Sequence, residues 1–352
     1  MENKITTPTP DGSISALQHV RSLLRGAGQV MFQDNALTGL FFLIGIFWGS
    51  YESGQILVAW GAIVGLLVST IVGYFSGMPC DDGRQGLWGF NGILVGCAFP
   101  TFLGSTVYMW LALILCAALT TWCRQAFNNI LRPLKVNSLT FPFVVMTWVF
   151  MLAARQMKGL PPDGLATPEL SSGYHAIFLS TDFAYQHFHL STWVAAWLKN
   201  IAQVFLIDSW ITGIFFLIGL AVANRWAALW AAVASFIALL VSLLWHAPEA
   251  AMHNGLYGFS AVLTGIALGC IFYRPGILSA IWAIIGIITT VFVQAAMDAL
   301  FLPLGLPTFT APFCLTTWLF LIPLFKLDEK EPNHSIWRSH HPKIENDTPQ
   351  NL

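Results

Sequence analysis

Two threonines occupy matching positions in the chain, and each is followed two residues later by a proline. Thr140 lies in the run Thr140-Phe141-Pro142-Phe143, and Thr310 lies in the run Thr310-Ala311-Pro312-Phe313. A hydroxyl both donates and accepts hydrogen bonds, so such a pair suits a small, uncharged, polar molecule. A threonine just before a proline in the first helical turn is also typical of a plain helix cap. The two roles are compatible, because a cap that borders a cavity can face it.

Each threonine ends a stretch in which the chain cannot remain helical. The first stretch, residues 124–140, contains Pro133, and the second, residues 298–310, contains Pro303 and Pro307. Non-helical backbone within an apolar region persists only where it lines a cavity or is buried in protein. Interrupted segments at corresponding places in two halves of a chain therefore indicate a binding or transport site.

The two halves of the chain repeat each other. Residues 29–45, 86–96 and 140–148 recur at 203–219, 255–265 and 310–318, at spacings of 174, 169 and 170 residues. The clearest match pairs Phe41-Phe42-Leu43-Ile44-Gly45 with Phe215-Phe216-Leu217-Ile218-Gly219. Three blocks in register indicate that the fold is built from two copies of one unit.

Aromatic and aliphatic side chains that suit a solute path occur in the same pairs. Phe90 and Leu94 are four residues apart and share one helix face, as do Phe259 and Leu263. Flat apolar walls admit a flat molecule and disfavour hydrated ions. An isolated phenylalanine in an apolar helix is usually a packing residue. Repetition beside a broken segment favours a place in the path.

The composition assigns these elements to a lipid bilayer. The 352 residues are 56% hydrophobic and only 9% charged, whereas a soluble domain carries about 25% charged residues. The net charge of −1 argues against nucleic acid as a partner. The chain shows no phosphate-binding glycine loop and no nucleophile–base or metal constellation, so we expect neither an enzyme nor a cofactor. The six cysteines are expected to be reduced packing residues.

Two minor features allow more than one interpretation. Asp34 and Asp208 match across the repeat; they suit either proton coupling or the capping of a helix start, and we favour capping. His187 and His189 could bind a metal, but they lack a third ligand at a telling spacing, so a solvated loop is favoured.

The apolar stretches predict an all-α integral membrane protein with ten transmembrane helices. The predicted spans are Leu37–Ser50, Ile56–Phe75, Leu87–Leu103, Tyr108–Cys123, Phe143–Ala154, Ile211–Ala223, Trp226–Trp245, Leu256–Phe272, Ile277–Leu300 and Phe313–Phe325. Five spans per half is an odd number, so the second half must be inverted relative to the first. Each repeat is expected to carry a re-entrant half-helix before its last span.

This layout divides the chain into five parts and fixes its orientation. Residues 1–28 and 327–352 are predicted tails, 29–155 and 201–326 the repeats, and 156–200 an extracytoplasmic linker. With both termini in the cytoplasm, 13 of the 16 Lys and Arg residues, Arg124 among them, fall on the cytoplasmic side and 3 on the other. The positive-inside rule supports this orientation. We expect a multi-pass protein of a cell inner membrane.

One motif resembles that of a known family. The run Leu306-Pro307-Thr308-Phe309-Thr310-Ala311-Pro312-Phe313 is similar to the urea-transporter signature L-P-x-x-T-x-P-F. The matching run at 136–143 keeps T-x-P-F but departs at the leucine and the first proline. The segment 25–35 also resembles the family pattern R-G-x-x-Q-V-x-F-x-x-N. The resemblance extends from about residue 25 to residue 325.

The resemblance implies a urea channel that assembles as a homotrimer, with a pore between the two halves of each subunit. The missing ATP-binding loop and the scarcity of acidic residues within the spans indicate passive flow. It implies that Thr140 and Thr310 lie at the pore centre and that Gln29 and Gln203, at the entry of the first helix in each half, lie near the line of acceptors. Two apolar slots would be formed by Val30, Phe32, Phe90 and Leu94, and by Val204, Leu206, Phe259 and Leu263. The alternative is a proton-coupled transporter of another small, amide-like solute.

Overall fold

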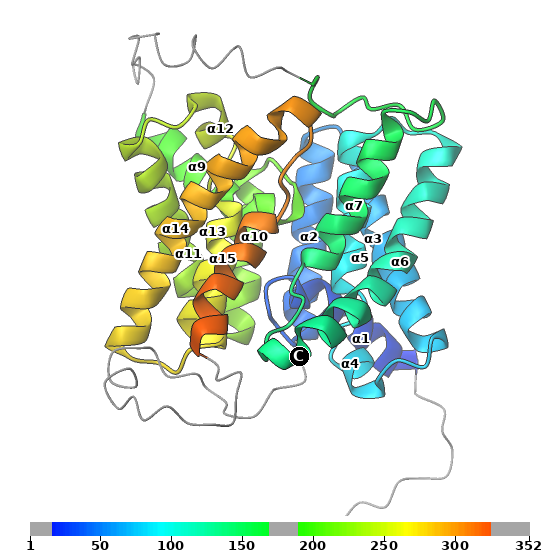
Figure 1. Ribbon diagram of the computed structural model, residues 1–352, viewed down its shortest axis with the longest axis horizontal. Helices are drawn as coiled ribbons and strands as arrows, with labels where there is room; N and C mark the ends of the chain where they lie inside the picture. The colour runs from blue at the N-terminus through cyan, green and yellow to red at the C-terminus, as the bar shows by residue number, and fades with distance from the viewer. Residues whose placement is uncertain (1–15, 169–188, 325–352) are drawn as a thin grey trace, which may run out of the picture.

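The computed structural model describes residues 16–168 and 189–324, and within these ranges every regular element is a helix. The first half contains α1 (Ala16–Gln29), α2 (Ala36–Glu52), α3 (Ile56–Phe75), α4 (Cys80–Arg84), α5 (Phe90–Phe102), α6 (Val107–Leu131) and α7 (Phe141–Ala154). The second half contains α9 (Leu190–Ala202), α10 (Trp210–Ala223), α11 (Arg225–Leu244), α12 (Glu249–His253), α13 (Phe259–Ile266), α14 (Ile277–Phe301) and α15 (Ala311–Leu321). Figure 1 shows the two halves side by side.

Helices α2 and α10 join the halves through reciprocal contacts. The Thr38 hydroxyl donates to the Gly219 carbonyl oxygen at 2.7 Å, and the Thr212 hydroxyl donates to the Gly45 carbonyl oxygen at 2.7 Å. Thr212 lies 174 residues after Thr38, and Gly219 lies 174 residues after Gly45. The same contact is therefore made twice with its partners exchanged, as a local two-fold relation requires.

The helices agree with the predicted spans, and four of them are long enough to cross a membrane alone. Each predicted span overlaps a helix. By length and apolar composition, Ile56–Phe75, Val107–Leu134, Arg225–Leu244 and Ile277–Leu304 qualify. A fifth span results if Leu190–Phe205 and Trp210–Ala223, which meet at 72°, count as one broken span. The remaining apolar helices are shorter, with 10–17 residues.

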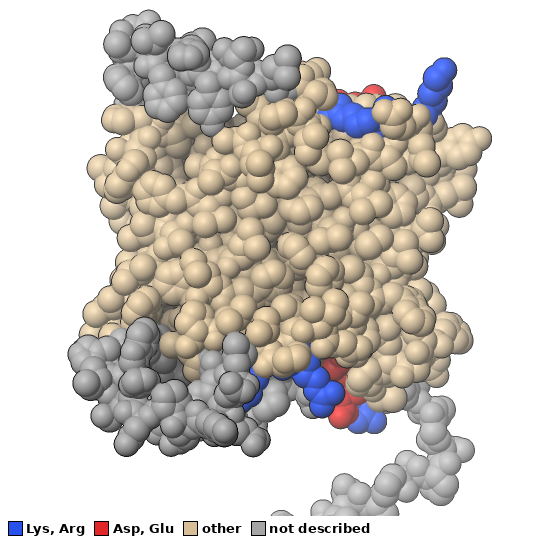
Figure 2. Space-filling model, in the orientation of Figure 1, with Lys and Arg blue, Asp and Glu red and all other residues tan. Residues whose placement is uncertain are grey.

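The outer surface supports a lipid environment. In the view of Figure 2, the charged side chains lie at two opposite ends, and a wide belt of other residues separates them. Large apolar side chains on the long helices face outward, among them Leu111 on α6 and Phe236 on α11. Because a bilayer favours an apolar exterior of this kind, the chain is an integral membrane protein.

Two helices lie where the sequence analysis placed irregular chain. Helix α1 occupies the end of the predicted tail 1–28, and α9 occupies the end of the predicted linker 156–200. Both are amphipathic and interrupted by polar residues, so neither forms the continuous apolar run by which spans are recognised. Both helices thus lie mostly outside the predicted repeats 29–155 and 201–326.

Small residues allow close packing inside the first half. Helices α3 and α5 approach each other through glycines, and a Cβ added to Gly65 would collide with the carbonyl oxygen of Gly92. The residue that matches Gly65 in the second half is Ala234, which lies on α11 and is fully buried. Close helix contact through small side chains is the usual means of packing in lipid.

Candidate functional site

The two matched threonines meet at the interface of the halves. Their Oγ1 atoms are 2.7 Å apart, and the side chains are only 3% and 2% exposed. Thr140 immediately precedes α7, and Thr310 immediately precedes α15. Neither side chain bonds to a backbone N–H of the helix that follows it. The hydroxyls are thus paired with each other, which is not the arrangement of a plain helix cap.

The backbone before each threonine is strained in the same way. Leu139 and Phe309 have φ values of 53° and 50°, in a left-handed region that a residue with a Cβ occupies at a cost of about 1–2 kcal/mol. Phe32 and Leu206, in the turns between the first two helices of each half, have φ values of 62°. Four strained residues at matched positions, two in each half, indicate a functional site.

The broken segments differ from the prediction in one respect. Helix α6 remains regular to Leu131, a 3₁₀ turn follows at Arg132–Leu134, and residues 135–140 then run without helix. The second half repeats this course after α14. No separate half-helix lies between the 3₁₀ turn and the threonine in either half. A short non-helical segment leads to each threonine, and the short α7 or α15 follows, because the prolines and the left-handed residues prevent helical hydrogen bonding.

A tryptophan from each half holds the broken segment of the other half. The Trp148 Nε1–H donates to the Pro307 carbonyl oxygen at 2.9 Å, and the Trp318 Nε1–H donates to the Asn137 carbonyl oxygen at 2.8 Å. The two tryptophans are 170 residues apart, as are the two acceptors. These bonds satisfy carbonyl groups that the breaks remove from helical bonding.

A cavity of about 40 Å³ opens beside Thr140. It gathers side chains from the first half with two phenylalanines of the second. The lining residues are Gln29, Val30, Phe32, Leu87, Phe90, Arg124, Asn128, Asn137, Ser138, Leu139, Thr140, Phe272 and Phe313. The volume suffices for a few water-sized molecules. Five residues selected from the sequence therefore line one cavity, and Thr140 of the central pair is among them.

The other selected residues do not line this cavity. Leu94 is fully buried, and Thr310 contacts the cavity residue Thr140 without lining the cavity itself. The remaining five occupy the matched places in the second half and are buried or half-buried there: Gln203, Val204, Leu206, Phe259 and Leu263. The equivalence extends to hydrogen bonds, because Gln29 donates to the Gln85 carbonyl oxygen at 2.9 Å and Gln203 donates to the Asn254 carbonyl oxygen at 2.8 Å.

Arg124 was missed in the selection of site residues. The sequence analysis counted it among cytoplasmic surface cations, but its side chain is only 3% exposed and lines the cavity. Its Nη1 lies 2.8 Å from the Asp82 Oδ2, and its Cζ lies 6.0 Å from the centre of the Phe90 ring. Asn128, one helical turn further along α6, accepts the Ser138 backbone N–H at 2.9 Å. The spacing of four between Arg124 and Asn128, next to a break, was the available signal.

The second half carries a different polar cluster at the matching positions. Gln294 lies 170 residues after Arg124, and its Nε2 donates to the Asp298 Oδ1 at 2.8 Å and to the Thr308 Oγ1 at 2.6 Å. The Thr308 hydroxyl donates to the same carboxylate at 3.1 Å. The residue that matches Asp82 is Ala251. This cluster has no cation, whereas the first half has a buried ion pair.

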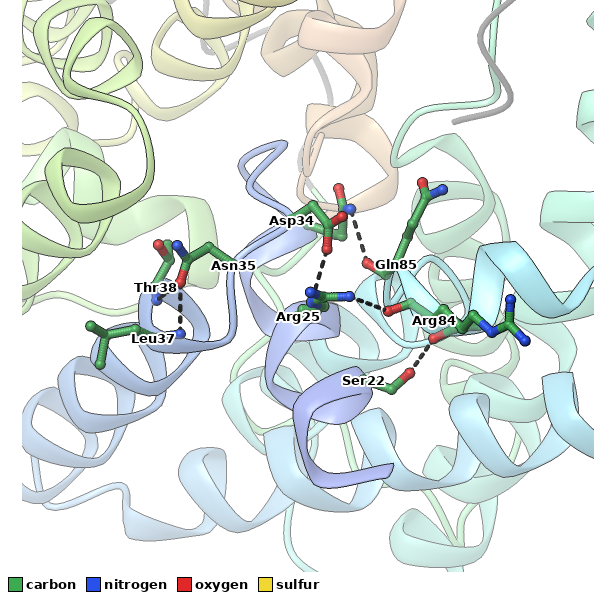
Figure 3. A network of polar contacts seen from close by, with 10 residues as sticks. Ser22, Arg25, Asp34, Asn35, Leu37, Thr38, Arg84 and Gln85 are labelled. Atoms are coloured by element: carbon green, nitrogen blue, oxygen red, sulfur yellow. Dashed lines mark hydrogen bonds and ion pairs between the residues drawn. The ribbon is translucent and has the colours of Figure 1, made fainter. Parts of the chain in front are cut away.

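The matched residues Asp34 and Asp208 form ion pairs and do not cap helices. Asp34 pairs with Arg25 at 3.1 Å, and Asp208 pairs with Lys199 at 2.7 Å. The caps are the next residues along the chain: Asn35 accepts the N–H groups of α2, and Ser209 accepts one from α10. Figure 3 shows Arg25 between Asp34 and the Arg84 carbonyl, with Asn35 turned toward α2. The capping assignment is therefore wrong.

Partial burial raises the pKa of Asp34 above its ordinary value, and the neighbouring Arg25 opposes that rise. Cys97, Cys116 and Cys314 are buried as the packing interpretation predicted, whereas Cys80 is exposed and does not fit it. Among the described residues, no group of His, Cys, Asp and Glu side chains could hold a metal ion; His187 lies outside them.

The fold and the site define a class: a helical membrane protein in which two halves of one chain enclose a polar, uncharged centre. Comparison with known proteins specifies it further. The family model described as urea transporter matches residues 20–324. The protein named urea transporter 1 from sheep (Ovis aries) is 27% identical over 325 residues, which cover 90% of this chain and 79% of the relative. The corresponding mouse protein (Mus musculus) is 26% identical over 323 residues, with 90% and 79% coverage.

The chain belongs to the urea transporter family. Its activity is accordingly the movement of urea across a membrane. The family match covers both threonine motifs and all five long or bent spans described above, and it begins within α1.

Proposed function

We propose that the chain is a passive urea channel whose pore passes between the two repeats of each subunit. The path runs from the cavity past Phe90 to the hydroxyl pair of Thr140 and Thr310, and continues along the matched residues of the second half. The pore-lining residues in this proposal are Gln29, Val30, Phe32, Phe90, Leu94, Thr140, Gln203, Val204, Leu206, Phe259, Leu263 and Thr310.

The observation that carries the proposal is the 2.7 Å contact between the hydroxyls of Thr140 and Thr310. It joins two residues 170 positions apart in a buried place where both broken segments end. The reciprocal contacts of Thr38 with Gly219 and of Thr212 with Gly45 support an inverted pair of five-span repeats with the axis through this point. In that arrangement the shorter apolar helices complete the ten spans.

The chemistry of the lining suits urea. Urea is planar and neutral, and removing its water costs several kcal/mol unless other hydrogen bonds replace it. The cavity offers a ring wall from Phe90 and hydroxyls from Ser138 and Thr140. The side-chain N–H of Gln29 donates to the Gln85 carbonyl oxygen. The side-chain oxygen of Gln29 then serves as the acceptor for a urea N–H. A flat wall opposite a line of acceptors compensates the loss of water without holding the solute tightly.

The passive mechanism is supported by where the two matched carboxylates lie. Asp34 and Asp208 are each 47% exposed and paired with a basic residue at the start of their repeat. Neither carboxylate is among the residues that line the cavity beside Thr140. The proton-coupled alternative was based on these two residues.

The test is urea flux into liposomes that contain the purified protein, measured by stopped-flow light scattering. The proposal predicts flux that is proportional to the urea gradient and unchanged when a pH gradient or a membrane potential is imposed. Protein-free liposomes provide the baseline. Uptake that collapses when a protonophore is added would establish coupled transport in place of a channel.

We also propose a homotrimer in a cell inner membrane, with both termini in the cytoplasm. The excess of Lys and Arg on the predicted cytoplasmic side supports the orientation. The mass of the detergent-solubilised protein, determined by light scattering, tests the trimer. Labelling of cysteines introduced near each terminus by an impermeant reagent, in intact and in opened cells, tests the orientation.

A further inference from the structure

The cavity in the first half contains a buried cation. Arg124 lines it, and the counter-ion Asp82, on α4, is not among the lining residues. The guanidinium lies between this carboxylate, 2.8 Å away, and the ring of Phe90, whose centre is 6.0 Å from its Cζ. The positive member of the pair therefore faces the solute space while the negative member lies behind it.

The matched place in the second half has the opposite character. Gln294 replaces Arg124, Ala251 replaces Asp82, and Asp298 replaces Asn128. The Asp298 carboxylate accepts hydrogen bonds from Gln294 and Thr308. One end of the proposed pore thus carries a cation beside its ring wall, and the other end carries an amide and a carboxylate.

We propose that Arg124 is a specificity-determining residue that excludes cations from the first-half end of the pore. The chemical class excluded is the planar organic cation of the size and shape of urea, of which guanidinium is the simplest member. This inference rests on the proposed channel function. It makes the two ends of the pore differ in their exclusion of cations, which two identical repeats would not do.

Shape alone does not separate the two solutes. Urea and guanidinium are both flat and of nearly equal size, and a phenylalanine face attracts a cation. The walls made by Phe32, Phe90 and Phe313 would therefore accept guanidinium at least as well as urea. A fixed like charge a few ångströms away, in surroundings of low dielectric constant, repels the cation and leaves a neutral molecule almost unaffected.

The contact with Phe90 serves the same end. The Arg124 guanidinium already lies over one face of this ring, so that face is not available to a second cation. Asp82 holds the guanidinium in place and compensates its charge, because an unpaired charge buried at this place would be strongly unfavourable. In the ion pair, Arg124 thus repels cations and Asp82 holds Arg124 in position.

The experiment measures inhibition of urea flux by guanidinium, well below denaturing concentrations, in right-side-out and in inside-out membrane vesicles. The expected result for the wild-type chain is inhibition from one side only. The variant Arg124→Gln/Asp82→Ala gives the first half the neutral residues of the second half. In this variant, guanidinium is expected to inhibit from both sides, with the inhibitory concentration on the formerly resistant side lowered by about tenfold or more.

Two further variants keep the test decisive if that one does not fold. Arg124→Lys preserves the charge and should preserve one-sided inhibition, and Arg124→Gln/Asp82→Asn is neutral with side chains of nearly unchanged size. Inhibition of the wild-type chain from both sides, or equal resistance of the wild-type and neutral chains on the first-half side, would overturn the proposal. Urea flux without guanidinium is measured in the same vesicles, so failure of the channel function appears separately, as absent flux in the wild-type chain.

Discussion

The two halves of this molecule share a backbone course but differ in the charge beside the site. Each has an initial amphipathic helix, a left-handed turn, a broken segment and a threonine at the start of a short helix. Their hydrogen bonds to each other are reciprocal at α2 and α10 and at the two tryptophans. Beside these common features, Arg124 and Asp82 form a buried ion pair in one half, and Gln294, Asp298 and Thr308 form a cation-free cluster in the other.

The comparison teaches which features the shared architecture requires. The hydrogen bonds that join α2 to α10 and those that hold the two broken segments are duplicated, because each broken segment depends on a tryptophan from the other half. Side chains that bond to a partner within their own half, as Arg124 does to Asp82 and Gln294 does to Asp298, can differ between the halves. The following paired substitutions test this distinction, each comparing one residue with its match.

The largest effect is expected from removing the buried cation. Arg124→Ala should lower the free energy of unfolding by about 3–5 kcal/mol, because Asp82 is then buried without a counter-ion. The matched change Gln294→Ala removes neutral hydrogen bonds and should cost about 1–3 kcal/mol. Thermal unfolding in detergent, followed by tryptophan fluorescence, measures both. Equal losses would show that the ion pair is not energetically distinct from the neutral cluster.

The central hydroxyls should matter equally for transport and unequally for stability. Thr140→Val and Thr310→Val should each reduce urea flux by about tenfold, the equivalent of one hydrogen bond. The Cys314 Sγ lies 3.4 Å from the Thr140 Oγ1 and is a second partner for it. Thr310→Val should therefore destabilise the protein less than Thr140→Val. Flux at the wild-type level in both folded variants would remove these residues from the path.

The reciprocal tryptophans should give a smaller and symmetric effect. Trp148→Phe and Trp318→Phe each remove one hydrogen bond to a broken segment of the other half, at a cost of about 1 kcal/mol. The two melting temperatures should fall by similar amounts, and Trp122→Phe, at an exposed position on α6, serves as the control. A loss confined to one tryptophan would mean that only one broken segment depends on the opposite half.

The smallest effect is expected at the paired carboxylates. Asp34→Asn and Asp208→Asn break ion pairs that are partly exposed, and such pairs contribute about 0–1 kcal/mol. Urea flux should be nearly unchanged in both variants, with and without a pH gradient. A large loss of flux that appears only under a pH gradient would restore a coupling role for these residues.

Much of the architecture could be predicted because it depends on patterns of residues that are close in the sequence. The ten apolar stretches, the repeat spacing and the prolines in the broken segments are properties of neighbouring residues, and the structure places a helix at each predicted span. The initial helices α1 and α9 were missed because an amphipathic helix of this length leaves no continuous apolar run. The assignment of Asp34 as a cap failed by one position, since Asn35 has an equally suitable side chain.

The sequence by itself determined that two similar units occur in one apolar chain, that each breaks before a threonine, and that the motif resembles that of urea transporters. Only the tertiary structure decided that Thr140 meets Thr310, that each tryptophan bonds to the other half, and that Arg124 lies inside the protein beside Phe90. The physical reason is the range of the interactions concerned. Hydropathy and turn preferences act between residues near in sequence, whereas these contacts join residues 34 to 181 positions apart, and their geometry exists only once the two halves have packed.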